Sequence, residues 1–289
     1  MHRIGRVLRL LDTFAGIGGF SFAAERLVGG FQTVAFVERE PFCQRVLAKH
    51  WPTVPIHDDI TTYEPQPGSA DVVCGGFPCQ DISKAGKVAW IAPGTRSGLF
   101  FDLMRTIRVV RPRYVVLENV AAIRKSNLGT VLSELAASGF NCEWACFPVS
   151  DLGASHRRDR WWLVAYPNPN DSQAGSEQLQ QRRAPAAGGS RGPGAAANAH
   201  PLDPQGCWPE GFQEQPAPGE AGRALWSAER AIRLDPNWRD FISEPVLCRG
   251  NDGLSNRVDR VKALGNAIVP HAAQPALLRV LELENLRAT

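Results

Sequence analysis

Short apolar runs alternate with longer helix-like segments through the first 166 residues of the chain. Each run is compact, as expected for a strand that is buried on both faces of a parallel sheet. The runs are Val7–Phe14, Thr33–Val37, Ala70–Cys74, Tyr114–Leu117, Cys142–Val149 and Trp161–Ala165.

The segments between the runs place apolar residues three and four positions apart, which is the spacing of one helix face. This spacing occurs from Phe20 to Leu27, from Leu99 to Val110 and from Leu128 to Leu135. A further helix is expected over 40–49, and a helical tail over Ala272–Leu286. An alternation of strands and helices predicts an α/β fold with a doubly wound sheet.

The pattern stops after Tyr166. Nine prolines and nine glycines fall within the 56 residues from Pro167 to Gly222, which hold only three residues of the Val/Ile/Leu/Met/Phe set. Such a segment buries too little apolar surface to offset its ordering entropy. We therefore expect about 167–200 to be disordered, and the tryptophans that follow indicate a small irregular lobe.

The net charge of the whole chain argues against nucleic-acid binding, but the distribution of charge along the chain is compatible with it. Lys+Arg 32 against Asp+Glu 29 gives a net charge of only +3, too small for a protein that coats nucleic acid. The segment 167–222 carries three arginines against six acids, so the remainder carries +6. Its arginines cluster at 105–113, 157–160 and 249–260, a distribution compatible with a DNA enzyme.

The seven cysteines are odd in number and scattered, and none completes a zinc pattern. They favour reduced thiols in a cytoplasmic protein without a metal. No stretch approaches the roughly 20 apolar residues of a membrane span. We expect a soluble protein without membrane association.

A glycine-rich turn follows the first strand. The strand ends at Asp12, and Gly16, Gly18 and Gly19 lead directly into a helix. Glycines let the backbone approach a ligand closely, and a helix N-terminus presents free N–H groups to it. A tight turn without a ligand explains this motif nearly as well.

Two acidic sites extend the pattern. Glu38 ends the second strand about 20 residues beyond the glycines, where a carboxylate accepts hydrogen bonds from a ribose diol. Alternatively, Glu38 and Glu40 offset the dipole of the next helix. Asp58-Asp59-Ile60 follow a third strand, where a carboxylate can reach an adenine amino group. The three features together imply an adenosine-containing cofactor.

A cysteine and an acid follow neighbouring strands. Cys79 leaves its strand through a Gly–Gly turn that Pro78 fixes, which favours a nucleophile over core packing. Cys74, within the strand, suits an inert buried thiol. Glu118 ends the next strand, where it can hydrogen-bond or protonate a heterocycle, although a Glu–Asn helix cap is the alternative.

Two arginines precede the last of these strands. Arg158 and Arg160 alternate, so both face one side of an extended segment. Their guanidinium groups suit a base carbonyl or phosphates, and a basic solvated edge is the plainer explanation.

In their order, these motifs resemble the DNA cytosine-5 methyltransferases of bacterial and phage restriction–modification systems. His156 stands where that family commonly has Gln. The segments that carry the resemblance are Asp12–Phe20, Glu38, Asp59-Ile60, Phe77–Gln80, Arg96–Phe101, Glu118–Val120, Arg158–Arg160 and Gly265–Pro270.

The resemblance implies a Rossmann-like class I S-adenosylmethionine-dependent methyltransferase sheet with a small irregular target-recognition lobe. It implies a catalytic, cofactor-binding domain at 1–166, a Pro/Gly-rich insert and target-recognition region at 167–250, and a C-terminal segment at 251–289 that returns to the first domain.

The resemblance also implies a mechanism. Cys79 attacks C6 of a flipped-out cytosine, Glu118 contacts N3 and the exocyclic amine, and Arg158 or Arg160 assists the thiolate and grips O2. The implied S-adenosylmethionine contacts are Phe14, Ala15, Gly16, Gly18, Gly19, Glu38, Asp59, Ile60, Pro78, Leu99 and Asn266. The implied DNA contacts are Gln80, Ser83, Arg96 and Asn119, with the loop 80–95 closing over the DNA.

The implied partners are double-stranded DNA and a cognate restriction endonuclease of the same system, and the implied state is a monomer in a bacterial or phage-infected cytoplasm. Three alternatives stay open. A tRNA cytosine-5 methyltransferase shares the motifs, but its Cys-Phe-Thr hallmark is absent from 167–262. A nicotinamide oxidoreductase explains the glycines but not Cys79 with Glu118, and a non-catalytic DNA-binding relative explains only the arginines.

Overall fold

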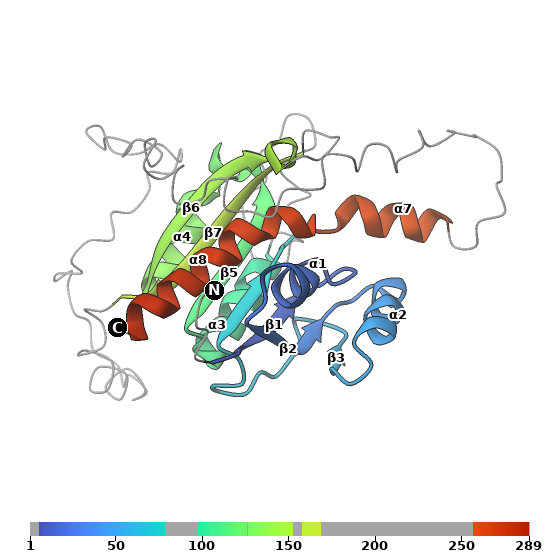
Figure 1. Ribbon diagram of the computed structural model, residues 1–289, viewed down its shortest axis with the longest axis horizontal. Coiled ribbons are helices and arrows are strands. Elements are labelled where there is room, and N and C mark those ends of the chain that lie inside the picture. Colours follow the sequence, from blue (N-terminus) through green and yellow to red (C-terminus); the bar gives the residue numbers. More distant parts are fainter. Residues whose placement is uncertain (1–5, 79–97, 126, 153–157, 169–256, 289) are drawn as a thin grey trace, which may run out of the picture.

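The computed structural model describes residues 6–78, 98–125, 127–152, 158–168 and 257–288 (Figure 1). The segment expected to be disordered and the expected irregular lobe fall almost wholly outside the described residues. Seven helices or helical turns and the strands of one sheet lie within the described parts of 6–168, and α7 and α8 lie within 257–288.

One sheet of seven strands, in the order β3-β2-β1-β4-β5-β7-β6, organises the described part of the chain. Strands β1 to β5 pair in parallel, whereas β7 runs antiparallel to both β5 and β6. The strands are β1 (Leu8–Thr13), β2 (Phe31–Val37), β3 (Ile56–His57), β4 (Val72–Gly75), β5 (Tyr114–Val120), β6 (Phe140–Pro148) and β7 (Asp159–Pro167).

The α/β fold is confirmed, but the expectation of a parallel sheet is wrong for the last two strands. Only residues 149–158 separate β6 from β7. A parallel connection needs a crossover of roughly a dozen residues or more, usually with a helix. The chain therefore reverses direction, and β7 is inserted between β5 and β6.

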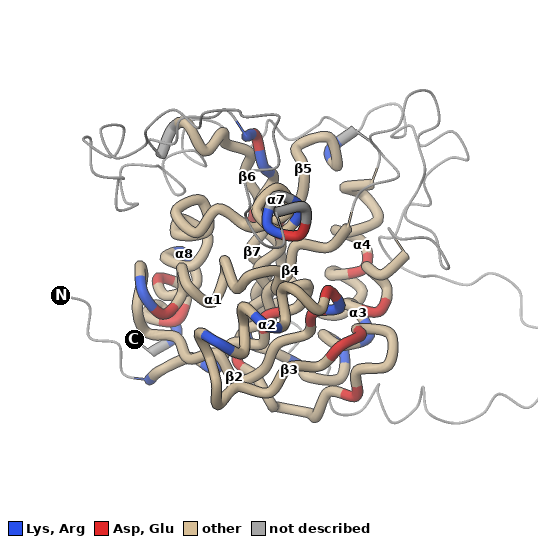
Figure 2. Tube along the Cα trace, turned by 90° about the vertical axis from the view of Figure 1, so that its right-hand side faces the viewer, with Lys and Arg blue, Asp and Glu red and all other residues tan. Residues whose placement is uncertain are grey.

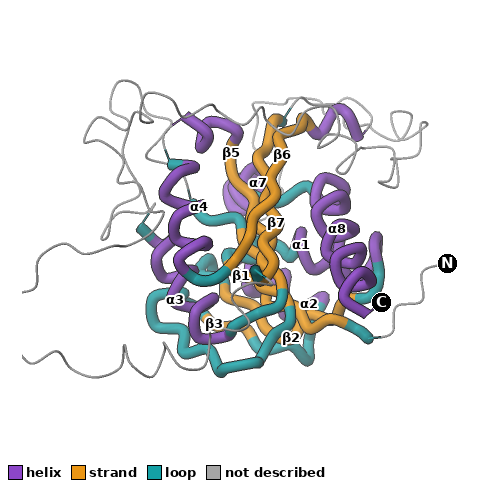
Figure 3. The backbone as a smooth tube through the Cα atoms, turned by 90° about the vertical axis from the view of Figure 1, so that its left-hand side faces the viewer, coloured by secondary structure: helices purple, strands orange, loops and turns teal. Residues whose placement is uncertain are grey.

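Helices cover both faces of the sheet (Figure 3). Helices α3 and α4 lie on one face, and α1 and α8 lie on the other. The helical elements are α1 (Gly19–Phe22), which continues into the π-helical η1 (Ala23–Val28), α2 (Pro41–His50), α3 (Leu99–Val110), the 3-10 turns η3 (Ala121–Lys125) and η4 (Val149–Leu152), α4 (Leu128–Ala137), α7 (Arg257–Asn266) and α8 (Pro270–Ala288).

Two adjacent tryptophans in β7 show how the sheet divides the core. Trp161 packs into the cluster formed with α3 and α4, and Trp162 packs into the cluster formed with α1 and α8. Successive strand residues point to opposite faces, so both indoles are buried only because β7 is an interior strand. Trp162 meets Phe20 edge-on, with ring centroids 5.8 Å apart, which ties α1 to β7.

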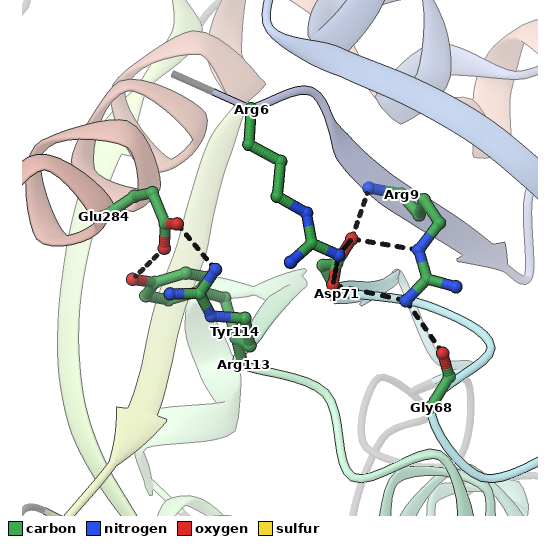
Figure 4. Close-up of polar contacts among 7 residues, drawn as sticks. All are labelled: Arg6, Arg9, Gly68, Asp71, Arg113, Tyr114 and Glu284. Carbon is green, nitrogen blue, oxygen red and sulfur yellow. Dashed lines mark hydrogen bonds and ion pairs between the residues drawn. The ribbon is translucent and has the colours of Figure 1, made fainter. Parts of the chain in front are cut away.

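Ion pairs hold the elements together at the amino ends of the parallel strands (Figure 4). Glu284 of α8 accepts hydrogen bonds from Arg113 Nη1 at 2.6 Å and from the Tyr114 hydroxyl at 2.9 Å. Asp71, just before β4, accepts hydrogen bonds from the Arg9 backbone N–H and Nε at 3.0 and 3.1 Å, and Arg6 Nη2 lies 3.1 Å away. The far end of α8 is thereby fixed at the edge opposite to the strand ends that carry the candidate chemistry.

We predict that Asp71→Asn lowers the free energy of unfolding at pH 7 by about 1–2 kcal/mol, since both arginines are partly exposed and screened. Burial alone raises the pKa of Asp71, but Arg9 and Arg6 outweigh it and lower the pKa. The stabilisation is thus complete above the unfolded pKa of about 3.9 and is lost as the pH falls through the lower folded pKa.

Urea unfolding at pH 7 and at low pH checks this prediction. The difference between wild type and Asp71→Asn should narrow in acid. Glu134→Gln removes a more exposed pair with Arg108 and should cost less than about 0.5 kcal/mol. Equal losses in the two variants would contradict the assigned role of Asp71.

Candidate active site

The carboxyl ends of the parallel strands bring most of the described candidate residues to one edge of the sheet. Strand β7 contributes from the other direction. Its antiparallel register sets Arg160 opposite Val120, so the start of β7 lies beside the end of β5. A parallel β7 would have carried Arg158 and Arg160 to the opposite edge.

The turn after β1 has an unusual backbone. Phe14 has φ +54°, a left-handed conformation that non-glycine residues rarely adopt, and Gly16 and Gly18 have φ +55° and +86°. Such strain costs about 1–3 kcal/mol and clusters at ligand sites. No heavy atom lies within 4 Å of the place where a Cβ on Gly16 would be, so this backbone faces open space. The turn therefore has room for a ligand.

Glu38 holds this turn in place. Its Oε2 accepts a hydrogen bond from the Gly16 N–H at 2.6 Å, and its Oε1 accepts one from the Glu40 N–H at 2.7 Å. Burial raises the pKa of Glu38, and these two hydrogen bonds oppose the shift. Each carboxylate oxygen has a further lone pair, so the group can also accept hydrogen bonds from a ligand hydroxyl. The sequence located Glu38 but gave no sign of its bond to Gly16.

Gly18 is required by both conformation and space. A Cβ there would lie 2.6 Å from the Trp51 ring, in addition to the strain of φ +86°. We predict that Gly18→Ala lowers the free energy of unfolding by about 2–4 kcal/mol, the sum of strain and overpacking. Gly68→Ala is the control, because Gly68 also has a positive φ, +68°, but nothing within 4 Å.

In thermal unfolding, Gly68→Ala should therefore show only the strain of about 1–2 kcal/mol. If the two variants lost equal stability, the contact with Trp51 would not be limiting.

The segment after β3 is held by its own side chains and by α3. Asp59 Oδ1 accepts hydrogen bonds from the Thr61 N–H and hydroxyl, both at 2.8 Å, and these bonds lower the pKa of Asp59. Arg105 of α3 donates to the Ile60 carbonyl at 2.6 Å. Leu99, the first residue of α3, packs with Phe14 against the same core cluster as Ile60. The candidate adenosine contacts thus come from three elements around one cluster.

Glu118 and Arg160 form an ion pair at the end of β5. Arg160 Nε lies 2.7 Å from Glu118 Oε1, and the side chains are only 20% and 14% exposed. Burial raises the pKa of Glu118, while Arg160 and Arg158 oppose the shift. Burial lowers the pKa of Arg158, and Arg160 lowers it further. Two arginines around one acid leave a positive, partly dry site, in contrast to a solvated basic edge.

Asn119 connects β5 to the segment that leads to Cys79. Its Nδ2 donates to the Phe77 carbonyl at 3.1 Å, and its Oδ1 accepts from the Val120 N–H at 2.8 Å. The Glu–Asn pair therefore does not cap a helix. A Cβ on Gly75 would lie 2.4 Å from Thr13 Oγ1, and one on Gly76 would lie 3.1 Å from Glu118 Oε2. Both glycines are needed for this close packing.

Several candidate residues fall outside the described part of the chain. These are Cys79, Gln80, Ser83 and Arg96, together with the whole loop 80–95 that we expect to close over DNA. Ala15 is buried next to the turn, Pro78 is half-buried after Phe77, and Asn266 is exposed at the last position of α7. The structure thus brings most of the described candidates together at one edge of the sheet, whereas Asn266 lies on α7.

Two residues with positioning contacts were not singled out from the sequence. Asp12 is fully buried, and its Oδ2 accepts hydrogen bonds from the Ser21 hydroxyl at 2.8 Å and the Ser21 N–H at 3.2 Å. Burial raises the pKa of Asp12 to about 7. The other residue is Ile268, which lies against Gly19 and Gly76. Both residues lie in segments that carry the resemblance, Asp12–Phe20 and Gly265–Pro270, but their residue types did not indicate these contacts.

Within the described ranges, no helix is long and apolar enough to cross a membrane. Among the same residues, no group of three or more His, Cys, Asp or Glu side chains is placed to hold a metal ion.

Comparison with known proteins gives one family match. The sequence model of the C-5 cytosine-specific DNA methylases matches residues 8–191. The type II methyltransferase M2.BsuMI of Bacillus subtilis (strain 168) is 35% identical over 174 residues, which are 57% of this chain and 44% of the relative. M.CviJI of Paramecium bursaria Chlorella virus IL3A is 33% identical over 160 residues, 54% of this chain and 42% of the relative.

The chain thus spans less than half the length of either relative. Among solved structures, a DNMT2 mutant of Spodoptera frugiperda is similar, with a TM-score of 0.46 and 21% identity, over 56% of this chain and 50% of that one. A similarity of this degree adds nothing to the sequence match.

Proposed function

Because the chain belongs to the C-5 cytosine-specific DNA methylase family, we propose that it transfers a methyl group from S-adenosylmethionine to C5 of a cytosine in double-stranded DNA. The main observation behind the proposal is the largely buried Glu118–Arg160 ion pair. Glu118 lies against Gly76, in the segment that leads to Cys79. An acid and two arginines at this edge, with a cysteine four residues after β4 in the sequence, suit addition to a heterocycle better than binding alone.

Cys79 is the proposed nucleophile, because cytosine C5 does not attack a methyl donor unaided. The thiolate forms a bond to C6 while the electrons of the C5–C6 double bond move toward N3, where Glu118 supplies a proton. The resulting enamine is nucleophilic at C5. C5 takes the methyl group and S-adenosylhomocysteine is released. Loss of the C5 proton to a base, departure of the thiolate and return of the N3 proton to Glu118 then restore the ring. A free thiol has a pKa of about 8.5, so Arg158 or Arg160 is proposed to favour the thiolate.

The described residues fit the methyl donor. S-adenosylmethionine, when bound, supplies the methyl group from a sulfonium centre. Gly16 presents its backbone to open space, and Glu38 retains acceptor capacity beside it. The proposed adenosine contacts are Phe14, Glu38, Asp59, Ile60, Pro78 and Leu99, and the amino-acid end is proposed to contact Ala15, Gly16, Gly18, Gly19 and Asn266.

Access to C5 and C6 requires the target base to leave the duplex. Unstacking costs a few kcal/mol. Protein contacts with the DNA backbone, and side chains that fill the gap left by the flipped base, must offset this cost. We propose Gln80, Ser83 and Arg96 for these contacts, and residues 167–250 for reading neighbouring bases. The expected DNA contact of Asn119 does not fit the structure, because its side chain is buried and its amide bonds to the main chain of Phe77 and Val120. A cognate restriction endonuclease and a monomeric state belong to the same proposal.

The test is a transfer assay with labelled S-adenosylmethionine, offered duplex DNA and tRNA in parallel. We expect label in the duplex at C5 of cytosine and none in tRNA. Label in tRNA alone would show that tRNA, and not DNA, is the substrate. Binding of DNA without methyl transfer would indicate a non-catalytic DNA-binding protein. Bisulfite sequencing of DNA from cells that express the protein would then identify the target sequence.

A further inference from the structure

The side chain of Ile268 lies between the glycine turn and the segment that leads to Cys79. A Cβ on Gly19 would lie 2.6 Å from the Ile268 carbonyl oxygen and 2.9 Å from its Cβ. A Cβ on Gly76 would lie 3.3 Å from Ile268 Cδ1 and 4.0 Å from its Cγ1. Different atoms of one residue therefore touch the two glycines, the main chain and Cβ on one side and the end of the side chain on the other.

The residues around Ile268 are anchored on both sides. On one side, α7 lies near α2 (Figures 1 and 2). There, Lys262 Nζ lies 2.9 Å from Oε1 of Glu40, whose N–H donates to Glu38. On the other side, α8 buries Ala272, Ala276 and further apolar residues against α1 and the sheet. Arg279 of α8 also pairs with Glu143 of β6 at 2.9 Å. The exposed Lys262 pair is weak, so α8 is the firmer anchor.

Gly76 extends the contacts to the acid. The position of a Cβ on Gly76 is 3.1 Å from Glu118 Oε2. Gly76 therefore lies in space between Ile268 and Glu118. Packed interiors transmit small displacements, because side chains have little free space in which to absorb them. A shift at Gly19 therefore moves Ile268 against Gly76, which precedes Cys79 by three residues.

From these contacts we infer that Ile268 is a positioning residue, which couples occupation of the glycine turn to the placement of Gly75–Pro78, the described residues that lead to Cys79. The inference rests on the proposed function, because it takes S-adenosylmethionine as the occupant. In this arrangement, cofactor binding orders the residues around Gly76 even before DNA is bound. The C-terminal segment thus links the two halves of the site in addition to packing on the sheet.

Ile268→Val is the sharpest test, because it deletes Cδ1 near Gly76 and keeps the main chain and Cβ near Gly19. Hydrogen exchange of the full chain is measured with and without S-adenosylhomocysteine. In the wild type, the ligand should slow exchange about fivefold in peptides containing Gly16–Gly19 and in those containing Gly76–Phe77. In Ile268→Val, only the first protection should persist.

Kinetics give a second measurement. We expect kcat for methyl transfer to fall about fivefold in Ile268→Val, with KM for S-adenosylmethionine unchanged within twofold. Ile107→Val deletes the same methyl group from a fully buried isoleucine of α3 and serves as the matched control. It should lower Tm comparably and retain both protections.

The outcomes separate the inference from the function. Equal protection of both peptides in Ile268→Val and in wild type would overturn the coupling alone. Loss of both protections would assign Ile268 a merely structural role, and would also overturn it. If the wild type failed to bind S-adenosylhomocysteine, the proposed function and the inference would both be wrong.

Discussion

Replacing Cys79 with alanine is expected to lower the rate of methyl transfer about 1,000-fold or more, because removal of a nucleophile leaves only binding and electrostatic effects. Cys74 of β4, and Cys142 and Cys146 of the edge strand β6, cannot replace Cys79 as the nucleophile. Cys74 is fully buried within β4, and burial raises its pKa well above the ordinary value. Burial also raises the pKa of Cys142, to about 12, and of Cys146, so neither readily forms a thiolate.

The rate of transfer under single-turnover conditions measures this effect, and calorimetric binding of S-adenosylhomocysteine checks that the variant is folded. Binding should be unchanged in Cys79→Ala. Cys146→Ala, on the edge strand β6, is the control and should transfer methyl groups within twofold of the wild type. Retention of a tenth or more of the activity by Cys79→Ala would assign the nucleophile elsewhere.

Glu118→Gln is expected to lower kcat about 100-fold, since an amide can donate a hydrogen bond to N3 but cannot deliver a proton. The substitution keeps the shape of the side chain while it removes the charge that faces Arg160 at 2.7 Å. Burial raises the pKa of Glu118, which favours the protonated form that the reaction needs. In the wild type, activity should fall as the pH rises through this pKa, and the variant should lack that descending limb.

Glu143→Gln provides a matched control for the ion pair. Glu143 pairs with Arg279 at 2.9 Å and is partly buried, like Glu118, but it lies on β6. This variant should lose stability and keep its kcat and pH profile. A comparable fall of kcat in both variants would show that the effect of Glu118→Gln comes from lost packing and not from its proton.

The fold was largely predictable because burial leaves a pattern along the chain. Compact apolar runs indicated the strands, and apolar residues three and four positions apart indicated the helix faces. The direction of β7 could not be read from such a pattern, because Trp161 and Trp162 are buried whichever way the strand runs. Connection length was the signal that decided it.

The candidate site was predictable where function depends on residue type and unpredictable where it depends on contacts. An acid at the end of a strand indicated Glu38 and Glu118. The structure places Glu38 directly after β2, and Glu118 within β5, two residues before its end. The bond from the Gly16 N–H to Glu38, and the contacts of Ile268, join residues remote in sequence. Their residue types are compatible with many positions, so only the structure reveals them.

The packing of α8 against η1 also has a consequence for the order of folding. These elements, Pro270–Ala288 and Ala23–Val28, stand near opposite ends of the described chain. Closing so long a loop adds little at equilibrium, about 0.6 kcal/mol per doubling of length, but contacts between remote segments form late. A chain still under synthesis can assemble β1, β2 and the glycine turn while Gly19 lacks Ile268. Completion of the turn therefore depends on residues that are made much later than the turn itself, and a nascent chain that lacks Ile268 should not retain a ligand there.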